Sequence, residues 1–392
     1  MKEPIIRFKG FTGEWGTAPL DECVEFLDNL RKPIDEGSRI KGIYPYYGAS
    51  GIVDYIHDYI FDEELILLSE DGANITDRNY PVCFLASGKY WVNNHAHVLR
   101  TKEDFVNNFV CNAMERKDYS LYNTGMAMPK LNKEVCKRIP LSYPIKGEQQ
   151  AIADYFQNIG SLIHSVTKKI ESLKQVKAAS LQSMFPQEGE TTPRVRFKGF
   201  VGEWDVVTLK ECLTINNERN QSNEYGIYDV LSVSDEVGVA NQIKLLGRSY
   251  AGKSVSNYRI LKTNQIVYTK SPLKLKPYGI VKVNNGPTGI VSVLYAIYDA
   301  KENVCADYIH YYFDPSYRIN NYLLPLINKG AKNTMNISDE MALTGCITIP
   351  SYDEQKKISE YLKSLDSQIA LLSQQLEKLQ QIKSACLDNM FV

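Results

Sequence analysis

The segment "GRSYAGKS", Gly247 to Ser254, has the spacing of a phosphate-binding loop, in which backbone amides and a lysine hold the phosphates of a nucleotide. Such a loop needs a strand before it and a helix after it. The residues that follow, "VSNYRILKTNQIVY", have the pattern of a turn and a strand instead. A nucleotide-binding enzyme therefore stays an alternative, and we expect Lys253 and Ser254 to contact a phosphate in a loop of another kind.

The pair "HAH", His95 and His97, places two imidazoles on one face of an expected strand, where they could ligate a metal. No third ligand stands nearby in the sequence, so we expect strand packing instead. The eight cysteines form no C-x-x-C pair and predict free, mostly buried thiols. The sequence also has no G-x-G-x-x-G, H-E-x-x-H or G-x-S-x-G motif. These patterns favour a binding protein over an enzyme, with no metal or cofactor on this chain.

A long basic stretch is the strongest sign of a nucleic-acid partner. The 62 residues from Val237 to Tyr298 contain no Asp or Glu but nine Lys or Arg, with tyrosines between them. A solvated protein surface normally mixes both signs of charge, so this stretch favours a phosphate-binding surface. The whole chain has a net charge of -1, so such a partner must be bound by a local patch. The candidate DNA-binding residues here are Lys244, Arg248, Lys253, Ser254, Lys270, Ser271, Lys274, Lys276 and Tyr278.

The first half of the chain has a weaker signal of the same kind. Basic residues lead into the aromatic and small residues of "YPYYGASG", and "GKYWVNN" follows later. Reading base pairs in the major groove requires hydrogen-bond donors and acceptors on loops. The candidate DNA-binding residues in this half are Arg39, Lys41, Tyr46, Tyr47, Ser50, Lys89, Asn93 and Asn94.

Two long helices are expected to position these candidates. In each, apolar residues recur at alternating steps of four and three, which is the heptad seam of a coiled coil. From Glu148 to Phe185 there are 38 residues, enough for a helix of roughly 57 Å. One seam needs a second, so we expect the helices to pair as an antiparallel coiled coil; ordinary core packing is the alternative. The seam positions are Ile152, Phe156, Ile159, Ile163, Val166, Ile170, Leu173, Ile358, Leu362, Leu365, Ile369, Leu372, Leu376 and Leu379.

The chain contains an internal repeat. "RFKGFTGEW" at Arg7 returns as "RFKGFVGEW" at Arg196, an offset of 189 (196 minus 7), and the helices repeat at an offset of 206 (350 minus 144). The segments between these shared ends differ and have the pattern of mixed α/β structure. We therefore predict an α+β protein with a pseudo-twofold repeat. The predicted parts are two globular domains at 1–147 and 194–353, two helices at 148–185 and 354–392, and a linker at 186–193.

Several motifs together resemble the specificity subunits of type I restriction-modification systems. They are the twin openings, both P-x-x-x-E-Q helix starts, "YPYYGASGIVDYI", "GKYWVNNHAHVLR", "MPKLNKEVCKRIPL" and "KSVSNYRIL". The resemblance covers essentially the whole chain. It implies two target-recognition domains that each read one half of a split DNA sequence, and a coiled coil that sets the gap. It also implies modification and restriction subunits as partners, which bring S-adenosylmethionine, ATP and magnesium.

We therefore expect a non-catalytic DNA-specificity subunit. The start "MKEPIIRFKG" lacks the apolar core of a signal peptide, and no apolar run approaches the length of a membrane span, so we expect a cytoplasmic protein. One departure from the family pattern is "MNISDE" at Met335 to Glu340, where the first half has "MPKLNK". A stand-alone DNA-binding or scaffold protein of the same architecture, without a methyltransferase partner, is the second alternative.

Overall fold

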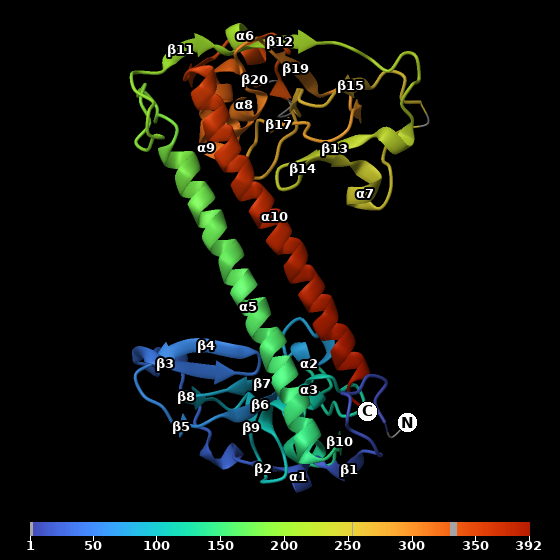
Figure 1. Ribbon diagram of the computed structural model, residues 1–392. Coiled ribbons are helices and arrows are strands. Elements are labelled where there is room, and N and C mark those ends of the chain that lie inside the picture. The colour runs from blue at the N-terminus through green and yellow to red at the C-terminus, as the bar shows by residue number, and fades with distance from the viewer. Residues whose placement is uncertain (1–2, 253, 330–334) are drawn as a thin grey trace. The chain divides into compact units, whose positions relative to one another are not determined.

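The computed structural model describes residues 3–252, 254–329 and 335–392, and the chain divides into two units (Figure 1). Unit 1 combines the residues up to Lys168 with Ser373–Val392, and unit 2 is Lys169–Leu372. The division does not fall at the 186–193 linker between the sequence repeats. Each unit therefore contains residues from both repeats.

Unit 1 is built on two four-stranded sheets. Its central sheet has the strand order β2-β9-β6-β7, formed by Val24–Phe26, Ala96–Thr101, Leu65–Ser69 and Cys83–Ala86. The other sheet has the order β4-β3-β8-β5, formed by Gly51–Ile56, Lys41–Gly48, Lys89–Val92 and Phe61–Asp62. All five residues of β6, "LILLS", are buried, because this strand lies inside the sheet and has packed side chains on both faces.

Short helices and one further strand pair complete unit 1. The strands β1 (Gly16–Pro19) and β10 (Pro140–Tyr143) are antiparallel. The helix α3 (Asn107–Glu115) packs on the central sheet and buries Phe109 and Met114. The remaining one-turn helices are α1 (Leu20–Cys23), α2 (Asn74–Asp77) and α4 (Lys133–Cys136).

Unit 2 repeats the central sheet and differs around it. The sheet has the order β12-β19-β16-β17, formed by Leu213–Asn216, Ala296–Ala300, Ile266–Tyr268 and Val281–Val283. The strand pairs around it are β11–β22 (Asp205–Thr208, Cys346–Ile349), β13–β14 (Leu231–Ser234, Gly238–Asn241), β15–β18 (Arg259–Leu261, Gly289–Val291) and β20–β21 (Asn328–Lys329, Met335–Asn336). Its helices are α6 (Leu209–Cys212), α7 (Gln242–Leu246), α8 (Ala306–Phe313) and α9 (Ser316–Leu323).

The two long helices are α5 (Lys146–Ser183) and α10 (Tyr352–Asn389), each starting two residues before the expected position. In unit 1 the beginning of α5 shares a core with the end of α10, and in unit 2 the end of α5 shares a core with the beginning of α10. The predicted antiparallel pairing is therefore confirmed within each unit. All fourteen seam positions are buried or half-buried. Among the described residues, no helix is apolar enough over a sufficient length to cross a bilayer.

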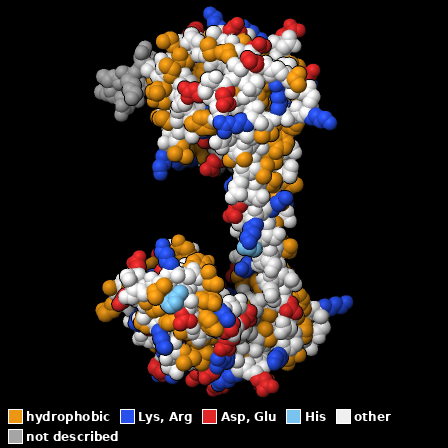
Figure 2. Space-filling view, turned by 90° about the vertical axis from the view of Figure 1, so that its left-hand side faces the viewer, with side chains coloured by type: hydrophobic (Ala, Val, Ile, Leu, Met, Phe, Trp, Pro, Cys, Tyr) orange, Lys and Arg blue, Asp and Glu red, His pale blue; other side chains and the backbone are white. Residues whose placement is uncertain are grey.

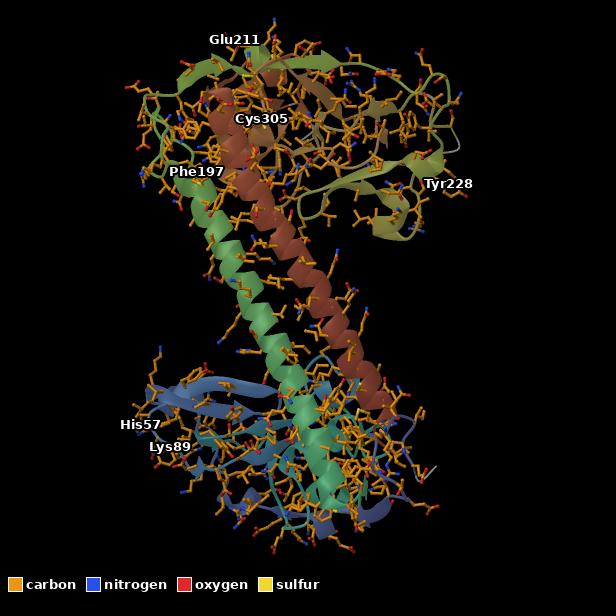
Figure 3. All side chains as sticks on the ribbon, viewed as in Figure 1. His57, Lys89, Phe197, Glu211, Tyr228 and Cys305 are labelled. Carbon is orange, nitrogen blue, oxygen red and sulfur yellow. The ribbon has the colours of Figure 1, made fainter. Side chains whose placement is uncertain are left out.

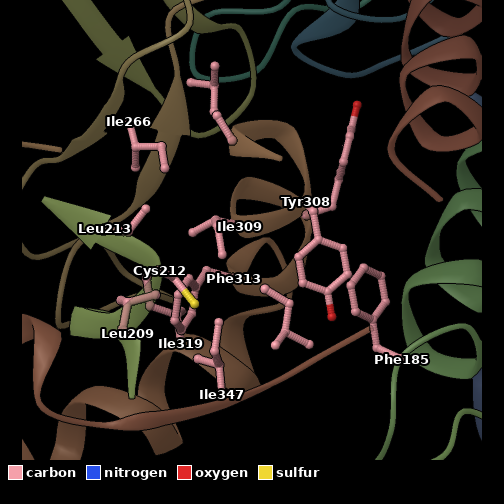
Figure 4. Packing of buried hydrophobic residues seen from close by; sticks show 14 of the residues in the cluster. Phe185, Leu209, Cys212, Leu213, Ile266, Tyr308, Ile309, Phe313, Ile319 and Ile347 are labelled. Atoms are coloured by element: carbon pink, nitrogen blue, oxygen red, sulfur yellow. The ribbon is translucent and has the colours of Figure 1, made fainter. Parts of the chain in front are cut away.

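Each repeat ends in a phenylalanine that packs beside the tryptophan in the opening of the other repeat. In unit 1, the ring centroid of Phe391 lies 6.4 Å from that of the Trp15 indole and 5.7 Å from that of Phe156. In unit 2, Phe185 lies 6.4 Å from Trp204 and 5.4 Å from Tyr308 (Figure 4). The seam and the domain cores are thus continuous, so coiled-coil pairing and core packing, posed as alternatives by the sequence, both occur.

The duplicated opening binds the first turn of a long helix. The guanidinium of Arg7 donates two hydrogen bonds to the carboxylate of Glu148, both 2.8 Å long. Arg196 does the same to Glu354 at 2.6 and 2.7 Å. Both glutamates are 1% exposed, so each needs its arginine as a partner. The repeated opening therefore has the same structural role in both halves, because it attaches each globular part to its long helix.

Backbone bonds beside these arginines join each repeat to the end of the other long helix. The amide of Ile6 donates to the carbonyl of Asn389 at 2.8 Å in unit 1. The amide of Val195 donates to the carbonyl of Ser183 at 2.9 Å in unit 2. The two bonds are equivalent under the repeat. Ser183 and Val195 are close in sequence, whereas Ile6 and Asn389 lie near opposite ends of it.

Candidate nucleic-acid interface

Four loops of unit 1 meet at one edge of its sheets. The amide of Glu70 donates to the carbonyl of His95 at 2.9 Å, and the amide of Gly72 donates to the carbonyl of Pro129 at 3.1 Å. A Cβ atom on Gly72 would lie 3.9 Å from that of Ala49, in the turn between β3 and β4. We call this group of loops the loop edge of unit 1. It consists of residues 48–51, 70–73, 93–95 and 123–130.

Two candidate residues of the first half lie exposed on the loop edge, namely Ser50 and Asn94. Two more, Lys41 and Lys89, are exposed elsewhere on the sheet of β4, β3, β8 and β5. Figure 3 shows Lys89 on the same side of unit 1 as His57. These four side chains are accessible to a ligand, as a DNA-contacting role requires.

Other candidates of the first half are part of the fold. Tyr46 is buried and its hydroxyl accepts a 2.9 Å bond from the amide of Ile34, and Asn93 is buried and accepts from the amide of His95 at 2.8 Å. The expectation that Tyr46 and Asn93 contact DNA directly is therefore corrected, because neither reaches the surface. Half-buried Arg39 lies 4.7 Å above the Tyr46 ring.

The last of this set, Tyr47, is also half-buried, and its ring lies 5.5 Å from that of Tyr90. Burial raises the pKa of Tyr47, so its hydroxyl stays protonated at neutral pH. Its aromatic contact places this side chain in the packing between strands.

The two histidines bind different carboxylates. The Nδ1 atom of exposed His95 lies 2.8 Å from Asp71. In buried His97, Nδ1 lies 2.8 Å from Asp28 and Nε2 lies 2.7 Å from the carbonyl oxygen of Leu131. Both ring nitrogens of His97 face acceptors, so the ring must donate from both and carry a positive charge. Here the sequence expectation of strand packing describes His97, which lies in β9.

The charge of His97 is stabilised by its surroundings. Burial alone would lower the pKa of His97, but hydrogen bonds to Asp28 and Cys136 outweigh this effect and raise it to about 10. The pKa of Asp28 is correspondingly lowered, since hydrogen bonding and charge from His97 outweigh the effect of its burial. The second hydrogen bond of the ring, to the carbonyl of Leu131, joins β9 to the residue at the base of the 123–130 loop. All eight cysteines are free thiols, and five are buried, as expected from the sequence.

In unit 2, acids from outside the basic stretch fold against it. Buried Lys276 lies 2.6 Å from Asp235, and buried Lys282 lies 3.0 Å from Asp314. Lys270 is paired with Asp339. Two further bases of the stretch are also in ion pairs, Arg259 and Lys262.

Five of the nine bases in the stretch are thus paired with acids of the same unit. A sequence window without acids is not a surface without acids, because segments distant in the chain supply them. The expectation that Lys276 lies on a DNA surface is corrected, since the side chain is only 6% exposed. Figure 2 shows Lys and Arg side chains scattered among other types on the visible face of unit 2.

Four candidates of unit 2 remain exposed: Lys244, Arg248, Ser254 and Lys274. The guanidinium of Arg248 lies 4.6 Å above the ring of Tyr250, which leaves its charge at the surface. Two others, Ser271 and Tyr278, are half-buried, and Lys253 lies outside the described residues. An interface of unit 2 with DNA phosphates would use this smaller group.

The phosphate-loop spacing at Gly247 to Ser254 occurs in the wrong surroundings. The one-turn helix α7 precedes it, and the strand β15 begins after it at Arg259. A nucleotide-binding loop requires the reverse order of strand, loop and helix. The described residues around this segment therefore do not support the nucleotide-binding alternative.

The sequence named no DNA-contacting candidate in residues 123–130, "NTGMAMPK", although 128–130 begin one of the family-like motifs. The structure places this segment on the loop edge with two exposed methionines at its tip. A signal was present, because Asn, Gly and Pro bracket the methionines as they do in tight turns.

A protein-family model described as the type I restriction modification DNA specificity domain matches residues 12–175 and again residues 202–381. A type I restriction enzyme specificity subunit of Methanocaldococcus jannaschii, MjaVIII, is 23% identical over 94% of this chain and 90% of that protein. A putative specificity subunit of Haemophilus influenzae is 34% identical, but the match covers 39% of each chain.

A solved structure has the same fold. The crystal structure of the type I restriction-modification system S subunit from M. genitalium aligns with a TM-score of 0.67, over 100% of this chain and 99% of that one. The sequence identity of 11% makes this a likeness of fold alone.

Proposed function

Because the chain belongs to the family of type I restriction-modification DNA specificity domains, we propose that it is the non-catalytic subunit that selects the DNA sequence for such a complex. Each unit reads one half of a split target. The observation that carries this proposal is the twofold match of the family model, once in each repeat. The Arg–Glu pairs and the exchanged phenylalanines give both units the same frame, so their different loops are free to read different bases.

A charge reversal at equivalent positions supports two different readers. After the central strands, the amides of Ser69 and Thr269 make equivalent bonds, to Val82 and Ile280. The next residue is Glu70 in unit 1, and in unit 2 it is a lysine, which is paired with an aspartate. In unit 1, Glu70 is bound by basic side chains instead. The same frame thus holds opposite charges at this position, each paired within its own unit, so the two units differ chemically where their loops begin.

We also propose that modification and restriction subunits bind this chain and carry S-adenosylmethionine, ATP and magnesium, and that the complex acts in the cytoplasm. Exposed apolar residues on the long helices support two equivalent docking sites. Val176 is 41% exposed, and Ile382, its equivalent in the repeat, is 47% exposed. Because these two exposed positions are equivalent under the repeat, they would offer the same contact twice, which suits two copies of one partner.

The test is to map methylated bases in the genomic DNA of cells with and without this chain. A split motif with a fixed gap, present only when the chain is expressed, is the expected result. Copurification of a methyltransferase would distinguish a specificity subunit from a stand-alone DNA-binding protein. Unchanged methylation together with ATP binding by the isolated chain would support the nucleotide-binding alternative instead.

A further inference from the structure

The loop at residues 123–130 has a fixed conformation. The side-chain oxygen of Asn123 accepts hydrogen bonds from the amides of Gly125 and Lys130, both at 2.9 Å. The amide of Thr124 donates to the carbonyl of Lys130 at 2.8 Å. A Cβ atom on Gly125 would lie 1.8 Å from the carbonyl oxygen of Met128, so only glycine fits there. These contacts close the loop at its base and fix the two ends from which its tip projects.

The base of the loop is anchored to the core of unit 1. The amide of Leu131 donates to the carbonyl of Glu70 at 2.7 Å, and the charged ring of His97 donates to the carbonyl of Leu131. The carbonyl of Pro129 accepts from Gly72. The loop is therefore a projection with an anchored base. Because it is already ordered, less conformational entropy is lost when a ligand binds.

The tip of this rigid loop is apolar and exposed. Met126 is fully exposed and Met128 is 61% exposed. Two large apolar side chains that stay exposed on a projection do not stabilise the fold, because they bury no apolar surface. Their exposure therefore favours a role in binding. Two methionines offer far less area than the roughly 800 Å² per partner of a stable protein interface. A narrow, deep site suits such a tip better than a flat protein surface does.

The charges around the tip are compatible with DNA. Glu70 is paired with Arg31 at 2.8 Å and with Lys130 at 3.5 Å, and Asp71 is bonded to His95. Glu70 is therefore compensated by two neighbouring bases, and Asp71 is engaged in a hydrogen bond. The accessible polar candidates Ser50 and Asn94 lie on the same loop edge.

We propose that the tip formed by Met126, Ala127 and Met128 enters a groove of bound DNA and contacts the base pairs of the half-site that unit 1 reads. This inference rests on the proposed function and names the residues that determine specificity in one unit. Apolar side chains discriminate bases through the thymine methyl group and through base stacking. They release no counterions, so their contribution should be independent of salt, unlike that of the lysines.

The test uses the full chain and selection from random duplexes, followed by affinity measurements at several salt concentrations. Met126→Ala combined with Met128→Ala should lose discrimination in one half-site and bind the preferred duplex at least about tenfold more weakly, within the range of a lost base contact. The slope of log affinity against log salt and the other half-site should be unchanged. Met126→Leu with Met128→Leu should retain the selection. The matched control is Ile145→Ala, which removes another exposed apolar side chain of unit 1 and should change neither.

Met126→Glu provides a second probe, because a charge at a fully exposed position does not disturb the core, yet it should abolish selection of the same half-site. Selection of the wild-type site by both the Ala and the Glu variants, with unchanged affinity, would overturn the proposal. An equal loss on all duplexes with a smaller salt slope would overturn it too, since that pattern belongs to phosphate contacts. If the wild-type chain and its copurified partners select no split site, the proposed function itself fails.

Discussion

The hydroxyl of Tyr155 lies 3.3 Å from the thiol sulphur of Cys386, so the beginning of α5 is bonded to the end of α10 in unit 1. Unit 2 contains the equivalent pair, in which the hydroxyl of Tyr361 lies 3.3 Å from that of Ser180. The 206-residue offset between the helices relates both members of the first pair to the second. The pseudo-twofold relation inferred from the sequence thus extends to single side-chain contacts.

Because Phe391 of the second repeat packs in unit 1, and Phe185 of the first repeat packs in unit 2, replacing either phenylalanine should destabilise the unit in which it packs. Phe391→Ala should destabilise unit 1 by roughly 3 kcal/mol, because it leaves a cavity beside Trp15 and Phe109. Amide hydrogen exchange should show lost protection within unit 1. The matched variant Phe185→Ala should have this effect in unit 2. Loss of protection in the unit that holds the rest of the same repeat would contradict the exchange.

A fragment of residues 1–189 should form a twofold dimer. The fragment has the pocket around Trp15 but lacks Phe391, and it carries the repeat-equivalent Phe185. In a dimer, Phe185 of each copy fills the pocket of the other and the two seams pair. Sedimentation should report a dimer, which should select an inverted repeat of one half-site. Phe185→Ala in the fragment should weaken the dimer, and a stable folded monomer of the unaltered fragment would refute the prediction.

The buried ion pair of His97 predicts a pH-dependent contribution to stability. The pKa of His97 is raised to about 10 in the folded chain, against about 6.5 for an unperturbed histidine. The stabilisation is therefore complete below pH 6.5, falls progressively as pH rises above it, and is lost above about pH 10. His97→Gln should cost about 2–3 kcal/mol at pH 6, because Asp28 loses the nearer of its two charged partners and keeps only Arg31.

Denaturant unfolding of the wild type and His97→Gln between pH 6 and pH 10 measures this difference. The gap between the two should shrink as pH rises. His95→Gln is the control, because His95 is exposed and its replacement should cost little stability. A gap for His97→Gln that stays constant over the whole range would show that folding does not raise the pKa of His97.

The two neighbouring lysines of unit 2 should behave differently in DNA binding. Lys274 is exposed, so Lys274→Ala should reduce the salt slope of binding by about one if it contacts a phosphate. Lys276 is buried against Asp235, so Lys276→Ala should lower the stability of unit 2 without changing the slope. Affinities measured at several salt concentrations, beside unfolding curves, separate the two effects. A reduced slope for Lys276→Ala in a fully folded protein would contradict the burial.

Patterns local in sequence predicted much of this fold. The heptad steps identified the seams, because a helix places residues three and four apart on one face. The offsets identified the repeat and its twofold relation. Neither showed that Phe391 completes the core around Trp15, since that contact joins opposite ends of the chain.

The candidate site was predicted less well than the fold. The basic stretch suggested an open phosphate surface, yet Asp235, Asp314 and Asp339 approach it from segments outside the stretch. Burial likewise separates Tyr46 and Asn93 from their exposed neighbours in sequence. Which polar side chain faces solvent depends on tertiary contacts, and a single sequence does not specify them.

The bond of Ile6 to Asn389 matches that of Val195 to Ser183, although a short connection, residues 184–194, joins only the latter pair. The joint that the linker spans in unit 2 is therefore made in unit 1 by a hydrogen bond without a covalent connection. A gene that encoded the second repeat first would specify the same set of contacts. Recombination between two such genes at the shared openings would exchange one reader and leave the joints intact, so new specificities can arise by shuffling whole halves.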